Sequence, residues 1–295
     1  MDRPSTGAVA SVPTRLGPLG VETVGSGPPV LLWHSLFVDS TTWVRVRQPL
    51  AATRRLVIVD GPAHGRSAAP RHPFTLDDCA GAALDVLEHL GIDEPVDWAG
   101  NAWGGHVGIT FAAAHPRRLR SLATIGAPVH ALTAPERRQI NLLVPLYRAV
   151  GPIRPVLGAL TTALLGAAAD PEAITLVAEA FSAPERGGMA RAIRSASLDR
   201  QDLTPTLTSV PAPTLFAAGA EDTAWTPDDA AAAAARLPRG GWAVLPGAGH
   251  VAPLLEAAPA VVDLLTAFWR DPDAVGALHR DSGARSGPQQ PQSTS

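Results

Sequence analysis

A glycine-rich turn at residues 100–105 has the residue spacing of a nucleophile elbow. It runs Gly100-Asn-Ala102-Trp-Gly104-Gly, after strand-forming residues and before a helical pattern. In the usual G-x-S-x-G elbow, a strained backbone lifts the central serine above the sheet edge, where its oxygen can attack a carbonyl carbon. Side chains two residues before and after the centre would collide where helix meets strand, so glycine is needed there. The spacing therefore predicts an acyl-transfer elbow with alanine at its centre.

Alanine at position 102 removes the attacking group from this elbow. Alanine has no lone pair, and the loss of a serine nucleophile lowers hydrolysis by roughly 10⁶-fold. An oxyanion hole and a binding pocket could still leave roughly 10³-fold over water. Glycine would relieve the strain of the elbow, because it has no Cβ to clash. Ala102 keeps the strain and discards the attack, which favours an inactivated hydrolase.

Polar residues follow the other predicted strands in a regular order. His34 follows the first strand-like run, and the loop at residues 60–67 follows the second. Asp222 ends the sequence Gly-Ala-Glu-Asp after a later run, and His250 ends Pro-Gly-Ala-Gly-His after the last one. A glycine-rich turn alone would be weak support for an elbow, and the ordered set of loops strengthens it.

Six short apolar runs alternate with helical patterns along the chain. Continuous apolar runs of this length are typical of strands buried on both faces, as in a parallel sheet. One intervening helix begins after Thr75, with Asp78 as its capping-box partner, and ends before Gly91. The alternation predicts an α/β fold with a doubly wound, mostly parallel sheet. The six runs are residues 30–34, 55–60, 95–99, 121–125, 213–217 and 242–245.

The alternation breaks once, where a helical cap is expected over residues 129–210. This stretch contains several prolines and no strand-like run, and helices are expected over 137–150, 153–168 and 171–181. Leucines on these helices cover more than one helical face, and some could line an apolar substrate pocket. With Val156, the residues concerned are Leu142, Leu143, Leu146, Leu157, Leu160, Leu164 and Leu165.

The core and the two ends of the chain follow from the remaining segments. Residues 14–128 and 211–270 are expected to form the α/β core. Residues 1–13 are rich in small and turn-forming types and are expected to be flexible. The tail at 271–295 ends in a polar, proline-containing sequence that cannot bury apolar surface, so it is expected to be disordered.

The elbow and its ordered loops resemble the α/β-hydrolase superfamily over residues 15–270. The most similar subset comprises small bacterial esterases, lactonases and enol-lactonases with a helical cap. Two positions depart from the usual pattern. Ala63 stands where a glycine is usual, and Ser35 replaces the glycine that often follows the histidine of the oxyanion loop. Neither change threatens the expected fold.

The resemblance implies a role for each matching position. His250 matches the general base, and Asp222 matches the acid that orients the imidazole and stabilises it when charged. The backbone N–H groups of Leu36 and Trp103 match the oxyanion hole, the second at a helix N-terminus. The order of nucleophile, acid and base along the chain is the one that this fold requires. The residues expected to line the pocket are Phe37, Trp103 and Trp225.

Other polar residues near these loops are expected to support the fold. Loop position favours Asp222 as the acid over its neighbours Glu221, Asp228 and Asp229. The residues expected to bind or pack within the protein are His34, Asp60, His64 and His106.

The resemblance implies a hydrolase of a small, apolar carboxylic ester or lactone, in which Ala102 has removed the nucleophile. Two alternatives stay open. A native non-hydrolytic enzyme, such as a lyase, cyclase or isomerase, could use His250 and Asp222 as a base dyad. A pseudoenzyme could bind a small molecule without transforming it.

Composition narrows the classes of partner. Apolar residues make up 46% of the 295 positions, enough for a sizeable core. Charged residues make up 17%, the net charge is −3 and no block of like charge occurs, so neither nucleic acid nor an anionic membrane is expected as a partner. The scattered histidines, the single Cys79 and the lack of a dinucleotide fingerprint predict no metal and no cofactor. Without an apolar leader or long span, we expect a cytoplasmic protein with a small-molecule substrate.

Overall fold

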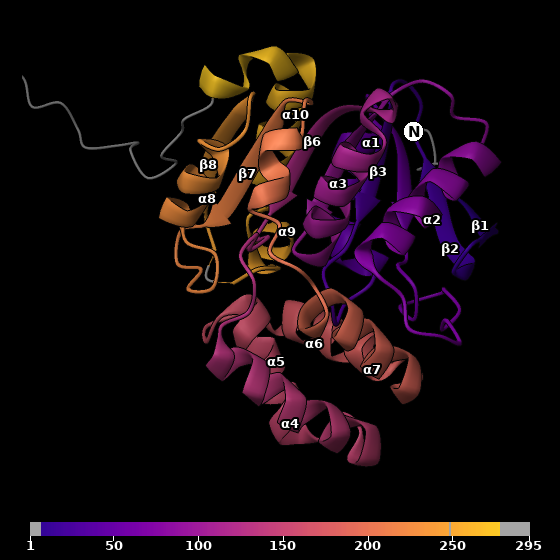
Figure 1. Cartoon of the computed structure of the whole chain (residues 1–295), viewed down its shortest axis with the longest axis vertical. Helices are drawn as coiled ribbons and strands as arrows, with labels where there is room; N and C mark the ends of the chain where they lie inside the picture. Colours follow the sequence, from indigo (N-terminus) through magenta and orange to yellow (C-terminus); the bar gives the residue numbers. More distant parts are fainter. Residues whose placement is uncertain (1–6, 248, 278–295) are drawn as a thin grey trace, which may run out of the picture.

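The computed structural model, which describes residues 7–247 and 249–277, contains an eight-stranded sheet with helices on both faces (Figure 1). The strand order is β1-β2-β4-β3-β5-β6-β7-β8. Pairing is parallel from β4 through to β8 and antiparallel between β1, β2 and β4. The predicted α/β fold with a mostly parallel sheet is confirmed.

The six predicted strands form the parallel part of this sheet. In β3 every residue is buried, because helices cover both faces of a parallel sheet. Leu31 and Trp33 pack on one face and Val30 and Leu32 on the other, as the two-residue repeat of a strand requires. The bounds are β3 (Pro29–Trp33), β4 (Arg55–Val59), β5 (Val96–Asn101), β6 (Leu119–Ile125), β7 (Thr214–Gly219) and β8 (Gly240–Leu245).

The expectation of a flexible segment over residues 1–13 is wrong for residues 8–13. Strands β1 (Ala8–Thr14) and β2 (Gly17–Val24) pair as an antiparallel hairpin at the edge of the sheet. Only Val12 of β1 is buried, so the strand lacks the continuous apolar run that marks the central strands. Gly17 has φ +95° at the turn, a conformation that glycine adopts at little cost. Residues 1–6 lie outside the described residues.

Helices cover the two faces of the sheet through separate apolar clusters. Helices α2 (Leu76–His89), α3 (Trp103–Ala114) and α8 (Pro227–Ala234) pack on one face. Helices α1 (Val44–Ala51) and α10 (Ala258–Arg270) pack on the other, and the short α9 (Ala252–Glu256) precedes α10. Helix α2 begins with the predicted capping box between Thr75 and Asp78. These helices hold the strands, and therefore the loops at their carboxyl ends, in fixed positions.

The predicted helical cap lies between β6 and β7, beyond the carboxyl ends of the parallel strands (Figure 1). A helix that the sequence did not predict, α7, starts at Arg186-Gly-Gly, and glycine is a poor helix former. The side chain of Glu185 accepts hydrogen bonds from the backbone of Gly187 and Gly188, which caps the helix despite them. The cap helices are α4 (Ala134–Val150), α5 (Arg154–Leu165), α6 (Pro171–Ser182) and α7 (Arg186–Ile193), followed by a π-helical turn, η3 (Arg194–Leu198).

Part of the tail expected to be disordered is folded. Residues Pro272–Ala277 form a 3-10 helix, η5, and Val275 is buried. Gly241 of β8 lies against the backbone of Val275, where a Cβ would overlap it. The tail prediction is therefore wrong for residues 272–277, and residues 278–295 lie outside the described residues. Within the described part of the chain, no helix is long and apolar enough for a membrane span.

Candidate active site

The elbow at Ala102 has the strained backbone that its sequence predicts. Ala102 joins β5 to α3 with φ 45° and ψ −103°, a region that residues with a Cβ seldom adopt. A Cβ on Gly100 would overlap the backbone of Gly104, and a Cβ on Gly104 would overlap the backbone of Trp33. The glycines therefore allow helix, elbow and neighbouring strand to pack at close range.

Backbone hydrogen bonds fix the elbow to the adjacent strand. The N–H of Ala102 donates to the carbonyl of Ile125, the last residue of β6, at 2.8 Å. The carbonyl of Ala102 accepts from Gly105 at 2.9 Å and from His106 at 3.1 Å, which starts α3. Ala102 is thus held on both sides, with its side chain at the cavity described below.

His250 and Asp222 form the predicted pair beside the elbow. Nδ1 of His250 lies 2.7 Å from Oδ2 of Asp222, and the side chains are 20% and 3% exposed. The other oxygen of Asp222 accepts from the backbone N–H groups of Ala224 at 2.9 Å and Trp225 at 3.2 Å. Because its oxygens accept, Asp222 favours a proton on Nδ1 and leaves Nε2 of His250 as the basic nitrogen.

Asn101, which the sequence reasoning missed, fixes the loop that carries His250. Its side-chain amide donates to the carbonyl of Ile125 at 2.9 Å and to the carbonyl of His250 at 2.6 Å. Gly126, with φ +60°, lies against the backbone of His250, where a Cβ would be 3.0 Å from its Cα. The only sequence signal was a polar residue directly before the elbow centre.

The two residues with the predicted oxyanion-hole amides line the same cavity. Trp103 is the first residue of α3, and Leu36 precedes Phe37, whose positive φ of 73° turns the loop after β3. Both residues line the cavity with Ala102. Within residues 7–247 and 249–277, the N–H groups of Leu36 and Trp103 have no protein acceptor. Such free donors can bind a negatively charged oxygen.

Two buried histidines support these loops, as expected. Nε2 of His34 accepts from the N–H of Gly61 at 2.8 Å, and its Nδ1 donates to the carbonyl of Ser35 at 2.7 Å. Nδ1 of His64 donates to the carbonyl of Pro62 at 2.9 Å. Burial lowers the pKa of His34. Burial, together with the neighbouring His34, lowers the pKa of His64 to about 3. Both rings therefore stay neutral at pH 7.

Asp60 anchors its loop, also as expected. Its carboxylate accepts from the backbone of Ser40 at 2.8 Å and from the backbone and side chain of Arg66 at 3.1 and 2.7 Å. It thereby connects the loops after β3 and β4, on which His34 and His64 lie.

A cavity of about 190 Å³ lies at the elbow, next to Ala102 and His250. Its core side includes Ala102, His250, Leu36, Phe37 and Trp103. The ring of Trp103 packs beneath the elbow against Trp33, His34 and His64, so little of it faces the cavity. The remaining lining residues are Ser35, His106, Pro128, His130, Leu132, Glu136, Leu164, Ala196, Ser197, Arg200 and Ala224.

The prediction that Trp225 lines the pocket is wrong. Its neighbour Ala224 lines the cavity, and the Trp225 ring is buried against Phe216 of β7, with a centroid distance of 5.8 Å. The N–H of Trp225 donates to Asp222, so the residue supports the acid from behind. His106, expected only to pack, does line the cavity, although its Nε2 also donates to the carbonyl of Pro128 at 2.8 Å.

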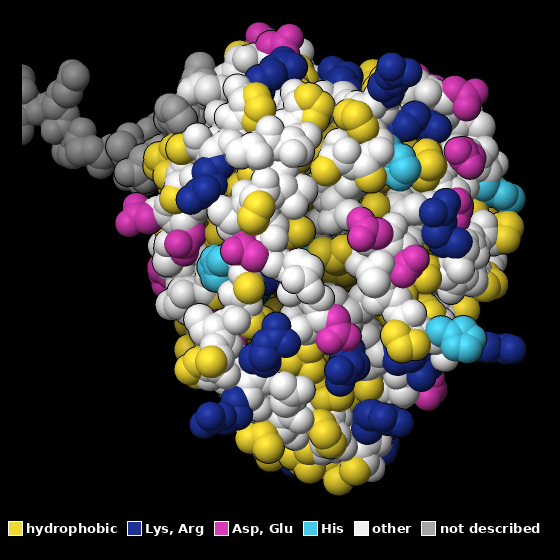
Figure 2. Space-filling view, in the orientation of Figure 1, with side chains coloured by type: hydrophobic (Ala, Val, Ile, Leu, Met, Phe, Trp, Pro, Cys, Tyr) yellow, Lys and Arg dark blue, Asp and Glu magenta, His cyan; other side chains and the backbone are white. Residues whose placement is uncertain are grey.

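The cap leucines divide between the cavity and the outer surface. Leu164 of α5 lines the cavity, as the sequence suggested. Leu142 of α4 is 71% exposed, and Leu143 and Leu146 are also exposed. Hydrophobic side chains accordingly gather at the end of the molecule formed by the cap, with basic side chains between them (Figure 2). Only some of the apolar side chains of the cap therefore line the cavity.

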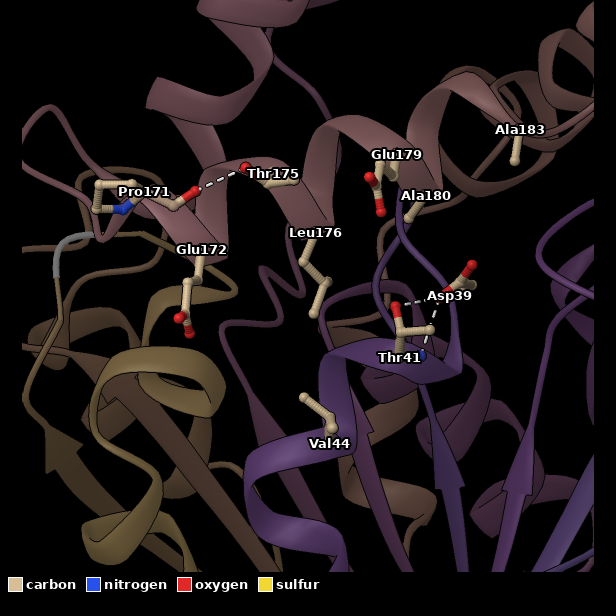
Figure 3. A pocket seen from close by; sticks show the side chains of 10 residues that line it. All are labelled: Asp39, Thr41, Val44, Pro171, Glu172, Thr175, Leu176, Glu179, Ala180 and Ala183. Atoms are coloured by element: carbon tan, nitrogen blue, oxygen red, sulfur yellow. Dashed lines mark hydrogen bonds between the residues drawn. The ribbon is translucent and has the colours of Figure 1, made fainter.

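A larger hollow, of about 720 Å³, is lined by residues of α6 and of the segment from Asp39 to Val44 (Figure 3). It separates cap helix α6 from the core, and Leu176 of α6 points toward Val44 of α1. Its wall includes Asp39, which accepts hydrogen bonds from Thr41. None of Ala102, Asp222 and His250 borders this hollow. The smaller cavity is therefore the candidate active site.

Comparison with known proteins places this chain in a family. The family model described as the Alpha/beta hydrolase family matches residues 30–264, most of the chain. The chain therefore belongs to the α/β-hydrolase family, as its elbow and loop order predicted.

Two solved structures show how closely the fold is shared. An esterase from Thermogutta terrifontis superposes with a TM-score of 0.82 and 23% identity, covering 91% of this chain and all of that one. An enol-lactonase from Burkholderia xenovorans LB400 gives a TM-score of 0.79 and 21% identity, covering 90% of this chain and all of that one. At these identities the likeness shows a common fold.

Curated relatives match over shorter stretches. A pimeloyl-[acyl-carrier protein] methyl ester esterase from Chromobacterium violaceum is 36% identical over 109 residues, 36% of this chain and 40% of that protein. A dihydrolipoyllysine-residue acetyltransferase component of an acetoin cleaving system from Pseudomonas putida is 35% identical over 101 residues, 34% of this chain and 27% of that protein. The chain thus matches less than half of either relative's length.

Proposed function

We propose that the site is that of a hydrolase of small carboxylic esters or lactones, with acyl transfer disabled by Ala102. The central observation is the His250–Asp222 pair, 2.7 Å between Nδ1 and Oδ2, beside an elbow that keeps φ 45°. Leu36 and Trp103, whose backbone N–H groups have no acceptor among the described residues, line the same cavity. The esterase and enol-lactonase that share the fold support this substrate class.

With serine at position 102, the geometry would support the acyl-enzyme route. Nε2 of His250 would take the proton of the serine hydroxyl as its oxygen attacks the carbonyl carbon. The amides of Leu36 and Trp103 would hold the negative charge on the carbonyl oxygen, and the leaving alcohol would take the proton from His250. Nε2 of His250 would then take a proton from water as its oxygen attacks the acyl carbon, and would return that proton to the serine oxygen as the carboxylic acid leaves. In the present chain only binding and polarisation of the carbonyl remain.

A second candidate is favoured by the intact pair itself. His250 keeps a fully hydrogen-bonded Asp222 even though the nucleophile is missing. Such a dyad can remove a proton from a substrate without covalent catalysis, as a lyase, cyclase or isomerase requires. This reading predicts turnover with Ala102 present that collapses in His250→Ala.

Restoring the nucleophile tests the first proposal. We expect Ala102→Ser to hydrolyse p-nitrophenyl esters or lactones at least 10³-fold faster than the parent chain, since the missing group accounts for roughly 10⁶ in rate. His250→Ala in the same background should abolish the gain. Failure of Ala102→Ser to form an acyl-enzyme or turn over any of these substrates would remove the hydrolase proposal. Ligand binding unaffected by His250→Ala, with no turnover in either chain, would identify a pseudoenzyme.

A further inference from the structure

The cavity wall contains a buried arginine that the proposed chemistry does not use. Arg200 follows the π-helical turn η3, where the cap returns to the core, and it lines the cavity together with Ala102 and His250. It also lines a second hollow, on the side of Asp199 and Asp202. The residue is only 6% exposed. A guanidinium stays charged in proteins, so this position places a fixed positive charge beside the elbow.

The hydrogen-bond partners of Arg200 are all neutral. Nη2 donates to the carbonyl of His130 at 2.6 Å, and Nη1 donates to the carbonyls of Val129 at 3.3 Å and Gln201 at 3.4 Å. Among residues 7–247 and 249–277, no carboxylate forms an ion pair with Arg200. Burial accordingly lowers the pKa of Arg200, since its charged form is only partly compensated. A buried charge without a paired anion is costly and calls for a ligand.

The acidic residues near Arg200 do not supply a paired anion. Asp202 and Glu136 attract it only from longer range. Oε2 of Glu136 accepts from the N–H and hydroxyl of Thr133, both at 2.7 Å, in the capping box of α4. His106, also on the cavity, stays neutral because burial and Arg200 hold its pKa well below the usual range. Among the described residues that line the cavity, Arg200 is the one arginine or lysine and Glu136 is the one carboxylate.

We propose that Arg200 is a specificity-determining residue that binds a carboxylate on the substrate. The substrate class is then a small ester or lactone with a free carboxylate at the end remote from the reacting carbonyl. This inference rests on the proposed function and changes its expected substrate from wholly apolar to acid-ended. Phe37, Leu132 and Leu164 would contact the carbon chain between the two polar ends.

The size of the cavity limits the candidates. An engineered cavity of roughly 150 Å³ binds benzene in another protein, and this cavity measures about 190 Å³. Half-esters of four- to six-carbon diacids are suitable probes, because their chain length samples the separation of carboxylate and ester. Monomethyl succinate and the uncharged methyl succinamate have almost the same shape, so their difference isolates the charge.

Binding to the unmodified chain is the first test. Calorimetry should show the best-fitting half-ester binding roughly 10- to 100-fold more tightly than its amide isostere, the range expected for a charge-assisted hydrogen bond. Equal affinity of the two probes would overturn the proposal, and this measurement needs no variant to fold.

Variants separate carboxylate binding from a purely structural role. Arg200→Gln should remove the preference for the half-ester while leaving amide binding within about threefold, whereas Arg200→Lys should keep part of it. Glu136→Gln, which preserves the capping box, should tighten half-ester binding by removing a nearby negative charge. Equal weakening of both probes in Arg200→Gln would mean that Arg200 only holds the loop at residues 129–130, and would overturn the proposal.

Turnover distinguishes this inference from the proposed function. If Ala102→Ser hydrolyses neutral and acid-ended esters with the same kcat/KM, the hydrolase proposal stands and the Arg200 proposal falls. If Ala102→Ser hydrolyses neither, while the half-ester still binds selectively through Arg200, the carboxylate site stands and the hydrolase proposal falls.

Discussion

The side-chain amide of Asn101 lies 2.6 Å from the carbonyl oxygen of His250, so the residue directly before the centre of the elbow holds the loop of the base. The same amide donates to Ile125 at 2.9 Å. Asn101 is buried at the end of β5, and its two bonds join three loops that are far apart in the sequence. Asn101 therefore helps to fix the position of His250 relative to Ala102.

Asn101→Ala should misplace the base. In the Ala102→Ser background we expect kcat to fall by roughly 10- to 100-fold with little change in KM, because a small displacement of a catalytic group is costly while the cavity wall is kept. Steady-state kinetics on a p-nitrophenyl ester measure the changes in kcat and KM separately. A rise in KM at constant kcat would instead place the effect of Asn101 on binding.

Ala102→Gly should stabilise the protein. Ala102 has φ 45° and ψ −103°, where a Cβ is strained and glycine is not. We expect the free energy of unfolding to rise by about 1 kcal/mol, measured by urea denaturation. Ala99→Gly, one strand position earlier than the elbow glycine, is the matched control and should destabilise. Equal losses in both variants would contradict the inferred strain.

Asp222→Asn should disable the restored enzyme. Asn would favour the wrong tautomer of His250, so in the Ala102→Ser background we expect kcat to fall by about 10⁴-fold. Glu221→Gln, at the exposed neighbouring acid, should change kcat by less than about twofold. A larger loss in the Glu221 variant than in the Asp222 variant would reassign the acid.

His64 should make the protein less stable in acid. Burial lowers its pKa to about 3 in the folded state, while the unfolded chain has a value of about 6.5. Between these pH values the unfolded state binds the extra proton, so stability falls as the pH drops through this window, by up to about 1.4 kcal/mol per pH unit. The buried His34 and His106 act in the same direction.

Replacing His64 should weaken the dependence of the unfolding free energy on pH in the acidic range. Urea denaturation of His64→Gln at several pH values from 4 to 7 should give a shallower dependence of the unfolding free energy than the parent chain. His72→Gln, at an exposed loop histidine, is the control and should retain the parent slope. The parent slope in His64→Gln would exclude His64 as a source of acid sensitivity.

The sequence predicted the parts of the fold whose burial is complete. Residues 29–33 of β3 are buried on both faces, so their apolar run was unambiguous. The hairpin of β1 and β2 was not predicted, because an edge strand with one buried residue resembles a loop in composition. Helix α7 was not predicted, because Gly187 and Gly188 lower helix propensity. The helix forms because the side chain of Glu185 caps its first turn.

The site divides in the same way between local and distant effects. Ala102, Asp222 and His250 are marked by local turns, whose glycines and strand ends can be recognised in one segment. Trp225 was misplaced because the direction of its ring depends on packing against Phe216. Arg200 gave no local signal at all, since only the return of the cap brings it to the elbow 98 positions earlier in the chain.

The carbonyl of Ile125 gives the cap a mechanical connection to the elbow. It accepts from both Ala102 and Asn101, and the chain leaves β6 at this residue to enter the cap. A displacement at the base of the cap would therefore lengthen the bond that shields the Ala102 amide. The rate of hydrogen–deuterium exchange at the Ala102 amide would therefore report cap movement. This rate should fall when a ligand holds the cap against the core.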